Sequence, residues 1–211
     1  MDVVVAASRK GGSGKTTVCR HLAVEAERAG DGPAVILDAD PMGGLSGWWN
    51  ARKDETPRFV PSSLDDLPRT LAALEKSGVP LVFIDTAPAA DADLRAVVSH
   101  ASLVIVPVRP SPDDLRAIGS TIDIVERLGK PMVFVVNQAT KRANITGQAA
   151  IRLSQHGTVA PAIVHHSVAF PASGVDGRTV QEVDPKGTPA AEVAELWSYL
   201  RARLARQAPG Q

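Results

Sequence analysis

The segment from Lys10 to Thr17 combines glycines, lysines and hydroxyl groups at the spacing of a phosphate-binding loop. It reads K-G-G-S-G-K-T-T and follows an apolar run that begins at Val3. Glycines allow backbone N–H groups to turn inward around phosphate oxygens, Lys15 can reach the β- and γ-phosphates, and the Thr16 hydroxyl can bind Mg²⁺. The segment therefore predicts that ATP and Mg²⁺ bind at Lys10, Gly11, Gly12, Ser13, Gly14, Lys15, Thr16 and Thr17.

Lys10 makes this loop unusual. The common pattern has a glycine five positions before Gly14, where this chain has Arg9, and Lys10 follows directly. Lys10 lies too near the start of the loop to duplicate the work of Lys15 on the same nucleotide. In this respect the loop resembles the deviant Walker A motif of the ParA/MinD ATPases, in which the early lysine reaches across a dimer to the partner's nucleotide. The resemblance implies a weak ATPase that forms a homodimer when ATP is bound, with Lys10 and Lys15 as catalytic residues.

Two further motifs place carboxylates at the ends of apolar runs. Asp85 follows residues 81–84, an arrangement typical of a carboxylate that holds Mg²⁺ through a water molecule. Asp38 and Asp40 end another run and, as alternate residues of a strand, point to the same side. An aspartate in either place can instead begin a turn. By resemblance to the family, Asp40 is the catalytic residue that orients or activates the attacking water, and Asp38 joins Thr16 and Asp85 around the metal.

Several later segments extend the resemblance. Residues 106–115 are rich in proline, which stiffens a loop near the nucleotide and the dimer face, and residues 176–182 and 188–193 resemble the family's closing segment. Together the matches run from about residue 3 to about residue 200 and are closest to the small ParF-like partition ATPases. Asn137 follows another apolar run, where it can hydrogen-bond the edge of adenine, although a polar residue at a strand end more often forms a turn.

These motifs need a scaffold that brings strand ends together, and the chain alternates strand-like with helical patterns. Strands are predicted at residues 3–7, 34–37, 81–84, 103–106 and 132–136, with a shorter one at 162–164. Helices are predicted after the phosphate loop and at residues 64–76, 91–99, 113–128, 145–156 and 189–206, with a long loop at 170–189. Repeated strand–helix–strand units predict an α/β fold with a doubly wound, mainly parallel sheet and helices on both faces, as in P-loop NTPases. We expect a single P-loop ATPase domain over residues 1–206 and a frayed tail at 207–211.

The composition agrees with this fold class and limits the possible partners. Of 211 residues, 44% are apolar and only 4% aromatic, which suits a buried sheet covered on both faces. Basic and acidic residues number 23 each, so no strong global field attracts nucleic acid or membrane. Cys19 is the one cysteine, which excludes an internal disulfide and the cluster-binding nitrogenase iron-protein branch. Neither a signal peptide nor a membrane-spanning run is present in the sequence, which predicts a cytoplasmic protein.

Three groups of residues leave a structural and a functional interpretation open. An apolar stripe of the last predicted helix, from Val193 to Leu204, favours core packing. The basic residues near it either form a solvated helix end or contact DNA phosphates; they are Arg201, Arg203 and Arg206. Trp48 and Trp49 either pack in the core or form part of a partner surface, where tryptophan is enriched.

The sequence therefore predicts an ATP-dependent dimeric switch. By family resemblance, the ATP-bound homodimer binds non-specific DNA and so associates with the nucleoid, and a ParB-like or cargo adaptor protein stimulates hydrolysis. The cargo is expected to be a plasmid, with a protein assembly as the other possibility. One alternative is a MinD-like membrane-associated ATPase, to which the chain's end at residues 206–211 is poorly suited, so no membrane partner is expected. The other is a small-molecule enzyme with the same loop, for which no second-substrate motif is found.

Overall fold

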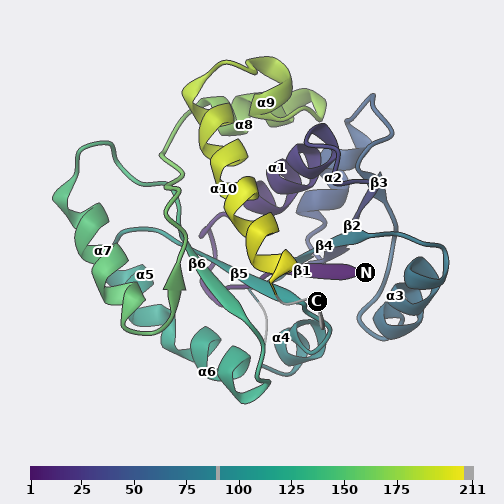
Figure 1. Cartoon of the computed structure of the whole chain (residues 1–211), viewed down its shortest axis with the longest axis horizontal. Coiled ribbons are helices and arrows are strands. Elements are labelled where there is room, and N and C mark those ends of the chain that lie inside the picture. Colours follow the sequence, from purple (N-terminus) through teal and green to yellow (C-terminus); the bar gives the residue numbers. More distant parts are fainter. Residues whose placement is uncertain (89–90, 207–211) are drawn as a thin grey trace.

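A parallel sheet of seven strands forms the centre of the computed structural model, which describes residues 1–88 and 91–206 (Figure 1). In the order in which they lie side by side, the strands are β3 (Arg58–Phe59), β2 (Ala34–Ala39), β4 (Leu81–Thr86), β1 (Asp2–Ala6), β5 (Leu103–Val108), β6 (Met132–Val136) and β7 (Thr158–Val159). The strand that precedes the phosphate loop, β1, lies in the middle, between β4 and β5. The predicted α/β class, with a doubly wound parallel sheet, is confirmed.

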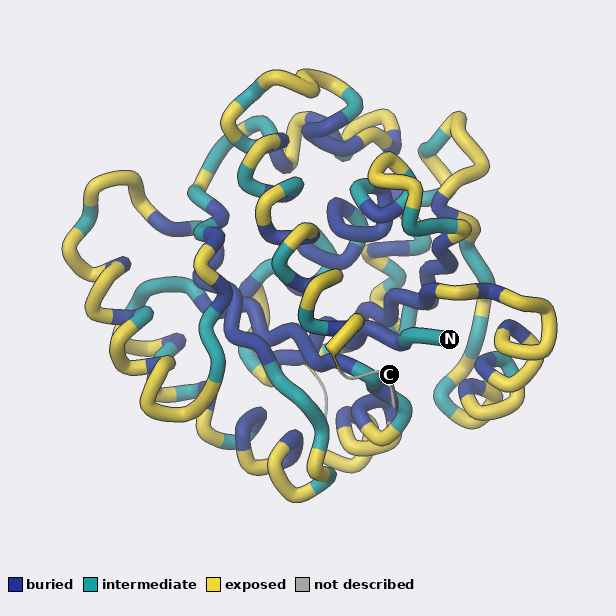
Figure 2. Tube along the Cα trace, in the orientation of Figure 1, coloured by how far each residue is buried: buried dark blue, intermediate teal, exposed yellow. Residues whose placement is uncertain are grey.

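Helices cover both faces of the sheet (Figure 1). One face carries α1 (Lys15–Arg28), α2 (Gly44–Asn50), α8 (Ala169–Ser173), α9 (Val180–Val183) and α10 (Thr188–Ala205). The other carries α3 (Leu67–Lys76), α4 (Asp91–Val98), α5 (Pro112–Ala117), α6 (Gly119–Arg127) and α7 (Asn144–Ser154). Because both faces are covered, the central strands β1, β4 and β5 are almost wholly buried, as the dark blue centre of Figure 2 shows.

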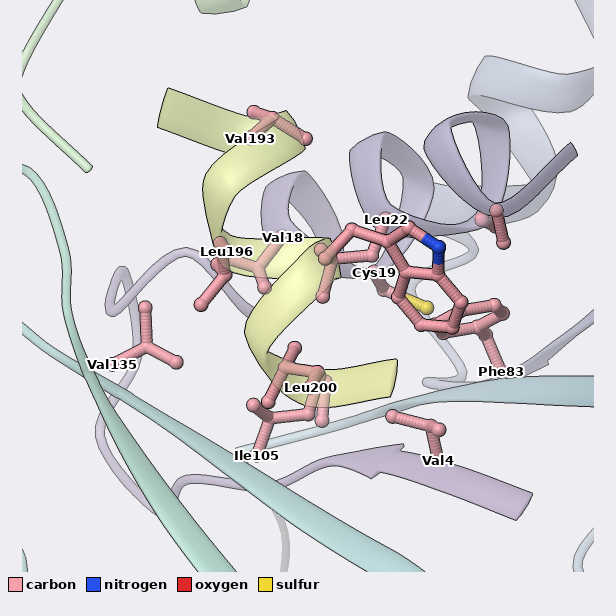
Figure 3. Close-up of a cluster of buried hydrophobic side chains, with 14 of the residues drawn as sticks. Val4, Val18, Cys19, Leu22, Phe83, Ile105, Val135, Val193, Leu196 and Leu200 are labelled. Carbon is pink, nitrogen blue, oxygen red and sulfur yellow. The ribbon is translucent and has the colours of Figure 1, made fainter. Parts of the chain in front are cut away.

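The last helix, α10, closes the core over α1 and the sheet. Its apolar stripe faces the helix α1 and the central strands, so that Leu196 and Leu200 lie near Val18, Ile105 and Val135 (Figure 3). Leu200 is completely buried, and the Trp197 ring lies 5.7 Å from that of Phe83, centroid to centroid. The prediction that this stripe is core packing is confirmed.

Three predicted elements differ in the structure. The strand predicted at residues 162–164 is wrong, because β7 ends before Pro161, which has no N–H group to continue the ladder. The helix predicted at 113–128 is interrupted at Ile118 and resumes at Gly119, a weak helix former. The predicted loop at 170–189 contains α8, α9 and a 3₁₀ turn at Gly174–Asp176.

The predicted tail at residues 207–211 lies outside the described residues. Within residues 1–88 and 91–206, no helix combines the length and the apolar character needed to cross a membrane.

Candidate nucleotide-binding site

The phosphate loop joins β1 to α1 at the edge of the sheet where the strands have their carboxyl ends. Gly14 takes φ +95° just before α1, and a Cβ atom there would collide with Nδ2 of Asn137. That Nδ2 donates a hydrogen bond to the carbonyl oxygen of Ser13 at 2.7 Å, and Gln138 Nε2 donates to the carbonyl of Gly12 at 3.1 Å. The residues after β6 therefore fix the course of the loop. Gln138 was not among the predicted site residues; its φ of +53° is rare for a residue other than glycine.

Lys15 begins α1 and lies beneath the loop with only 6% of its surface exposed. Burial lowers the pKa of its ammonium group, while the negative charges of Asp85 and Asp40 act in the opposite direction. Ser13 Oγ, close to it in the loop, is also buried and has no hydrogen-bond partner within the described residues. A buried ammonium and an unpaired hydroxyl beside inward-turned glycines form a site suited to phosphate oxygens.

The predicted metal residues meet at the ends of α1, β2 and β4. Asp38 and Asp85 are direct neighbours across the β2–β4 pair. Thr16 Oγ1 donates a hydrogen bond of 2.5 Å to Asp85 Oδ2. Asp85 is fully buried, and its Oδ1 has no partner within the part of the chain that the structure describes.

The electrostatics of Asp85 fit a divalent cation. Burial raises the pKa of its carboxyl group to about 7, and the charges of Asp38 and Asp40 add to that rise, whereas Thr16 and Lys15 oppose it. A cation beside the free oxygen would favour the charged carboxylate, and hydroxyl and carboxylate oxygens are the ligands that Mg²⁺ prefers. The donor set of Thr16 and Asp85, with Asp38 adjacent, therefore fits Mg²⁺.

Asp38, near the end of β2, and Asp40, just after it, both accept backbone hydrogen bonds. Asp38 accepts from the backbone N–H of Asp40 at 3.1 Å and of Ser46 at 2.8 Å, and so holds the start of α2. Asp40 Oδ1 accepts from the N–H of Met42 at 2.9 Å. A Cβ atom on Gly44 would lie 3.6 Å from the Thr16 side chain, so α2 begins directly beside the loop. Turn formation and a role in the site are therefore compatible.

A cavity of about 540 Å³ opens beside the first turn of α1, in the range of small-ligand pockets. Its lining includes Thr17, Arg20, Asn137, Gln138, His165 and Phe170. Asn137 uses one hydrogen of its Nδ2 on the loop, so its side-chain oxygen and its second amide hydrogen are available to adenine, and the adenine contact stays a prediction. His165 Nδ1 donates to the carboxylate Oε1 of Glu192 at 2.7 Å, and the His165 backbone N–H donates to Oε2 at 3.0 Å, so this histidine is held in a fixed position.

Lys10 lies at the open end of the loop. Its backbone N–H donates to Ser8 Oγ at 3.2 Å, and its side chain is half-buried. Within the described residues no carboxylate forms an ion pair with Lys10. That the Lys10 ammonium group reaches the nucleotide of a partner chain stays a prediction.

The three arginines predicted to contact DNA have different environments. Arg201 Nη1 forms an ion pair with both oxygens of Asp31, at 2.9 and 3.1 Å. Arg203 is half-buried and its Nη2 lies 3.5 Å from Thr158 Oγ1, whereas Arg206 is exposed just after α10. Their DNA contact stays a prediction, and the ion pair leaves Arg201 less available for it.

The two tryptophans of α2 belong to the core. Trp48 is 4% exposed and its Nε1 donates to the carbonyl of Arg178 at 3.1 Å. Trp49 Nε1 donates to the carbonyl of Pro57 at 2.9 Å, and its ring packs on Phe59. The core interpretation is therefore confirmed for Trp48, whereas Trp49 is half-buried and packs against the edge of that core.

Comparisons with known proteins agree with this geometry. A model of the CobQ/CobB/MinD/ParA nucleotide-binding domain matches residues 4–180. The chain is 39% identical over 122 residues to the maintenance of carboxysome distribution protein A of Gloeobacter kilaueensis, a match that spans 57% of this chain and 55% of that relative. It is 31% identical over 160 residues to protein ParA of Rhizobium radiobacter, across 70% of each chain.

Among solved structures, the septum site-determining protein MinD of Pyrococcus horikoshii, in complex with Mg-ADP, superposes with a TM-score of 0.81 at 15% identity over 99% of both chains. At that identity the likeness shows a shared fold. Since the family model covers most of the chain and its phosphate loop, the chain belongs to the CobQ/CobB/MinD/ParA family of nucleotide-binding domains.

Proposed function

We propose that this chain is a ParA-like ATPase that dimerises when ATP is bound and separates after hydrolysis, and thereby positions a cargo. One observation carries the proposal. An additional lysine without an ion pair among the described residues, Lys10, stands at the open end of a loop that already has Lys15 buried beneath it. A single nucleotide needs one such lysine, so the second is available to the nucleotide of another copy.

The other residues of the site bind ATP and arrange its hydrolysis. Lys15 and the backbone N–H groups of the loop hold the β- and γ-phosphates, and Thr16 and Asp85 hold Mg²⁺. Mg²⁺, when bound, neutralises charge on the phosphate oxygens. Asp40 orients the attacking water, since Oδ1 is engaged by a turn and Oδ2 has no hydrogen bond within the described residues.

Dimerisation follows from charge. Two triphosphates brought face to face repel each other, and an ammonium group supplied by each chain to the other's phosphates offsets that repulsion. Loss of the γ-phosphate removes much of the charge that Lys10 binds. The dimer is therefore expected to persist only while ATP is intact.

The dimer is proposed to bind non-specific DNA, and an adaptor protein on the cargo is proposed to stimulate hydrolysis. The chain has no net charge, so DNA contacts must come from a local basic patch that dimerisation doubles. Two named relatives support different cargoes: one takes part in carboxysome distribution and the other is a ParA protein. A plasmid and a protein assembly are both compatible with this site.

Nucleotide-dependent DNA binding tests the proposed switch. The affinity for a fluorescent duplex of arbitrary sequence is measured with ATP and Mg²⁺, with ADP, and without nucleotide. We expect binding with ATP only, and a steep loss as salt rises, because counterions are released from DNA. Equal binding in all three states would contradict the switch. Co-sedimentation with liposomes in place of DNA would instead favour a membrane-associated ATPase.

A further inference from the structure

Arg109 lies beside the phosphate loop, although the nucleotide site described above does not use it. It follows β5 in the proline-rich segment, where Pro107 and Pro110 restrict the backbone. Its Nη1 is the nearest side-chain atom to Gly12, lying 3.9 Å from the position that a Cβ atom would occupy there. A guanidinium group therefore stands against the half of the loop that contains Lys10.

A buried carboxylate fixes the position of Arg109. Its Nε donates to Asp114 Oδ1 at 3.0 Å, and Asp114 is only 4% exposed. The other oxygen of Asp114 accepts from Ser111 Oγ at 2.5 Å, and Ser111 Oγ also accepts from the Asp114 N–H at 3.2 Å. Because Asp114 is held on both oxygens, it fixes one edge of the guanidinium group in a defined direction.

The other edge of Arg109 is available. Within the described residues neither Nη1 nor Nη2 forms a hydrogen bond, and 35% of the side chain is exposed. The neighbouring Arg9 differs, because its Nη1 forms an ion pair with Asp91 at 3.2 Å. Among the described residues, two cationic groups beside the first half of the loop are therefore available to a phosphate: the Lys10 ammonium, which has no ion pair, and the Nη groups of Arg109.

We propose that Arg109 is a phosphate-binding residue that contacts the terminal phosphate of ATP at this edge, alongside Lys10. A guanidinium group anchored through Nε offers its two Nη groups as a fork, the geometry that phosphate oxygens accept bidentately. The inference rests on the proposed ATP-dependent dimer. The contacted phosphate belongs either to the same chain's nucleotide or to the partner's, and the chemistry is the same for both.

Substitution of Arg109 tests this role through the preference for ATP over ADP. In Arg109→Gln the affinity for a non-hydrolysable ATP analogue is expected to fall by about tenfold, as for loss of a charge-assisted hydrogen bond, while the affinity for ADP stays within about twofold. ATP-dependent dimerisation should weaken in parallel. The matched control is Arg116→Gln, which removes the same charge from an exposed i,i+3 pair on α5 and should change neither quantity.

A second variant separates phosphate contact from folding. Arg109→Lys keeps the charge but loses the anchored fork, so we expect an ATP affinity between those of wild type and Arg109→Gln, with unchanged ADP binding. If wild type dimerises with ATP and Arg109→Gln retains the wild-type ATP-to-ADP preference, the inference is wrong while the proposed function stands. If wild type itself stays monomeric with ATP, the proposed function fails first.

The same measurement in the Lys10→Ala background, expected to be monomeric, identifies the source of the phosphate. An undiminished effect of Arg109→Gln there assigns the contact to the chain's own nucleotide. An effect that disappears in that background assigns it to the partner's nucleotide.

Discussion

Among single residues, Asp40 is the one whose proposed role separates ATP hydrolysis from ATP binding. Its negative charge acts on the Lys15 ammonium, but within the described residues it makes no hydrogen bond to the phosphate loop. Asp40→Ala is therefore expected to bind ATP normally and to hydrolyse it roughly a hundredfold more slowly, as when a general base is lost, so that dimers accumulate. Phosphate release in single-turnover experiments and light scattering measure the two effects. Rapid phosphate release from Asp40→Ala would contradict the assignment, and Asp65→Ala, an exposed aspartate, is the control.

His21 makes folding sensitive to acid. Its Nδ1 donates to the Thr17 carbonyl at 2.7 Å and its Nε2 accepts from the Val180 N–H at 3.3 Å, so the neutral ring is the one that fits. Burial, with the charge of Arg20 adding, lowers the pKa of His21 from 6.5 to about 3. Because the unfolded chain binds this proton at a higher pH, the contribution of His21 is present above pH 6.5 and is lost progressively as the pH falls toward 3.

The test compares wild type with His21→Gln in urea unfolding between pH 7.5 and pH 5. Below the pKa of His21 in the unfolded chain, we expect the free energy of unfolding to fall by about 1.4 kcal/mol per pH unit because of this residue. The contribution of Asp85 to stability changes with pH in the opposite direction. Its pKa in the folded chain is about 7, above its unfolded value, so its protonation stabilises the fold as the pH falls. Both proteins contain Asp85, so only the difference between them is used. We expect the stability advantage of wild type to narrow as the pH falls; a constant difference would contradict the buried neutral ring.

At the scale of elements, an ion pair ties the end of α2 to α9. Arg52 has 3% of its side chain exposed and pairs with Glu182 through two hydrogen bonds, of 2.6 and 3.0 Å. Arg52→Ala should lower the free energy of unfolding by about 3 kcal/mol, because it removes a buried guanidinium group that also donates to the carbonyls of Thr56 and Gly177 and deprives the half-buried Glu182 of its charged partner. The exposed Arg69–Asp66 pair is the control, and Arg69→Ala should cost less than about 1 kcal/mol. If chemical denaturation gave the same loss of unfolding free energy for Arg52→Ala and Arg69→Ala, burial would not determine how much these ion pairs stabilise the fold.

Elements whose signals are local in the sequence were predictable. The apolar runs that end at Asp85 and Asn137 gave strands with nearly the observed bounds, because a strand buried on both faces is uniformly apolar. The helix α2 was missed, since its glycines and Trp48 are not typical of a short helix, and its position depends on Asp38 accepting from the Ser46 N–H.

The site was predictable in its residue types and less so in its contacts. The two motifs, together with the expectation that strand ends meet at one edge of the sheet, indicated that Thr16 and Asp85 lie near one metal site, and the structure brings them into hydrogen-bond contact. Gln138 and Arg109 were not predicted to contact the loop, because both reach it from segments that are distant in the sequence: Arg109 follows β5, which lies next to β1, and Gln138 follows β6, one strand further away. Contacts of this kind depend on strand order, which periodicity does not give.

At the scale of the whole molecule, one fold places every loop residue at a single edge of the sheet. At that edge, beside the buried Lys15, lie the Lys10 ammonium, which has no ion pair among the described residues, and the Nη groups of Arg109, which there form no hydrogen bond. Phosphate oxygens can pair with both groups, and the nucleotide of a second copy of the chain supplies such phosphate in the proposed dimer. The account therefore depends on assembly as well as on the single chain.

The mass of the particle in solution with a non-hydrolysable ATP analogue and Mg²⁺ tests that central claim most directly. Light scattering after size-exclusion chromatography is expected to give a dimer for wild type and for Lys76→Ala, an exposed lysine on α3. Lys10→Ala is expected to stay monomeric while its affinity for the analogue remains of the same order. A dimer of Lys10→Ala at the same concentration would contradict the claim that this lysine binds the partner's nucleotide.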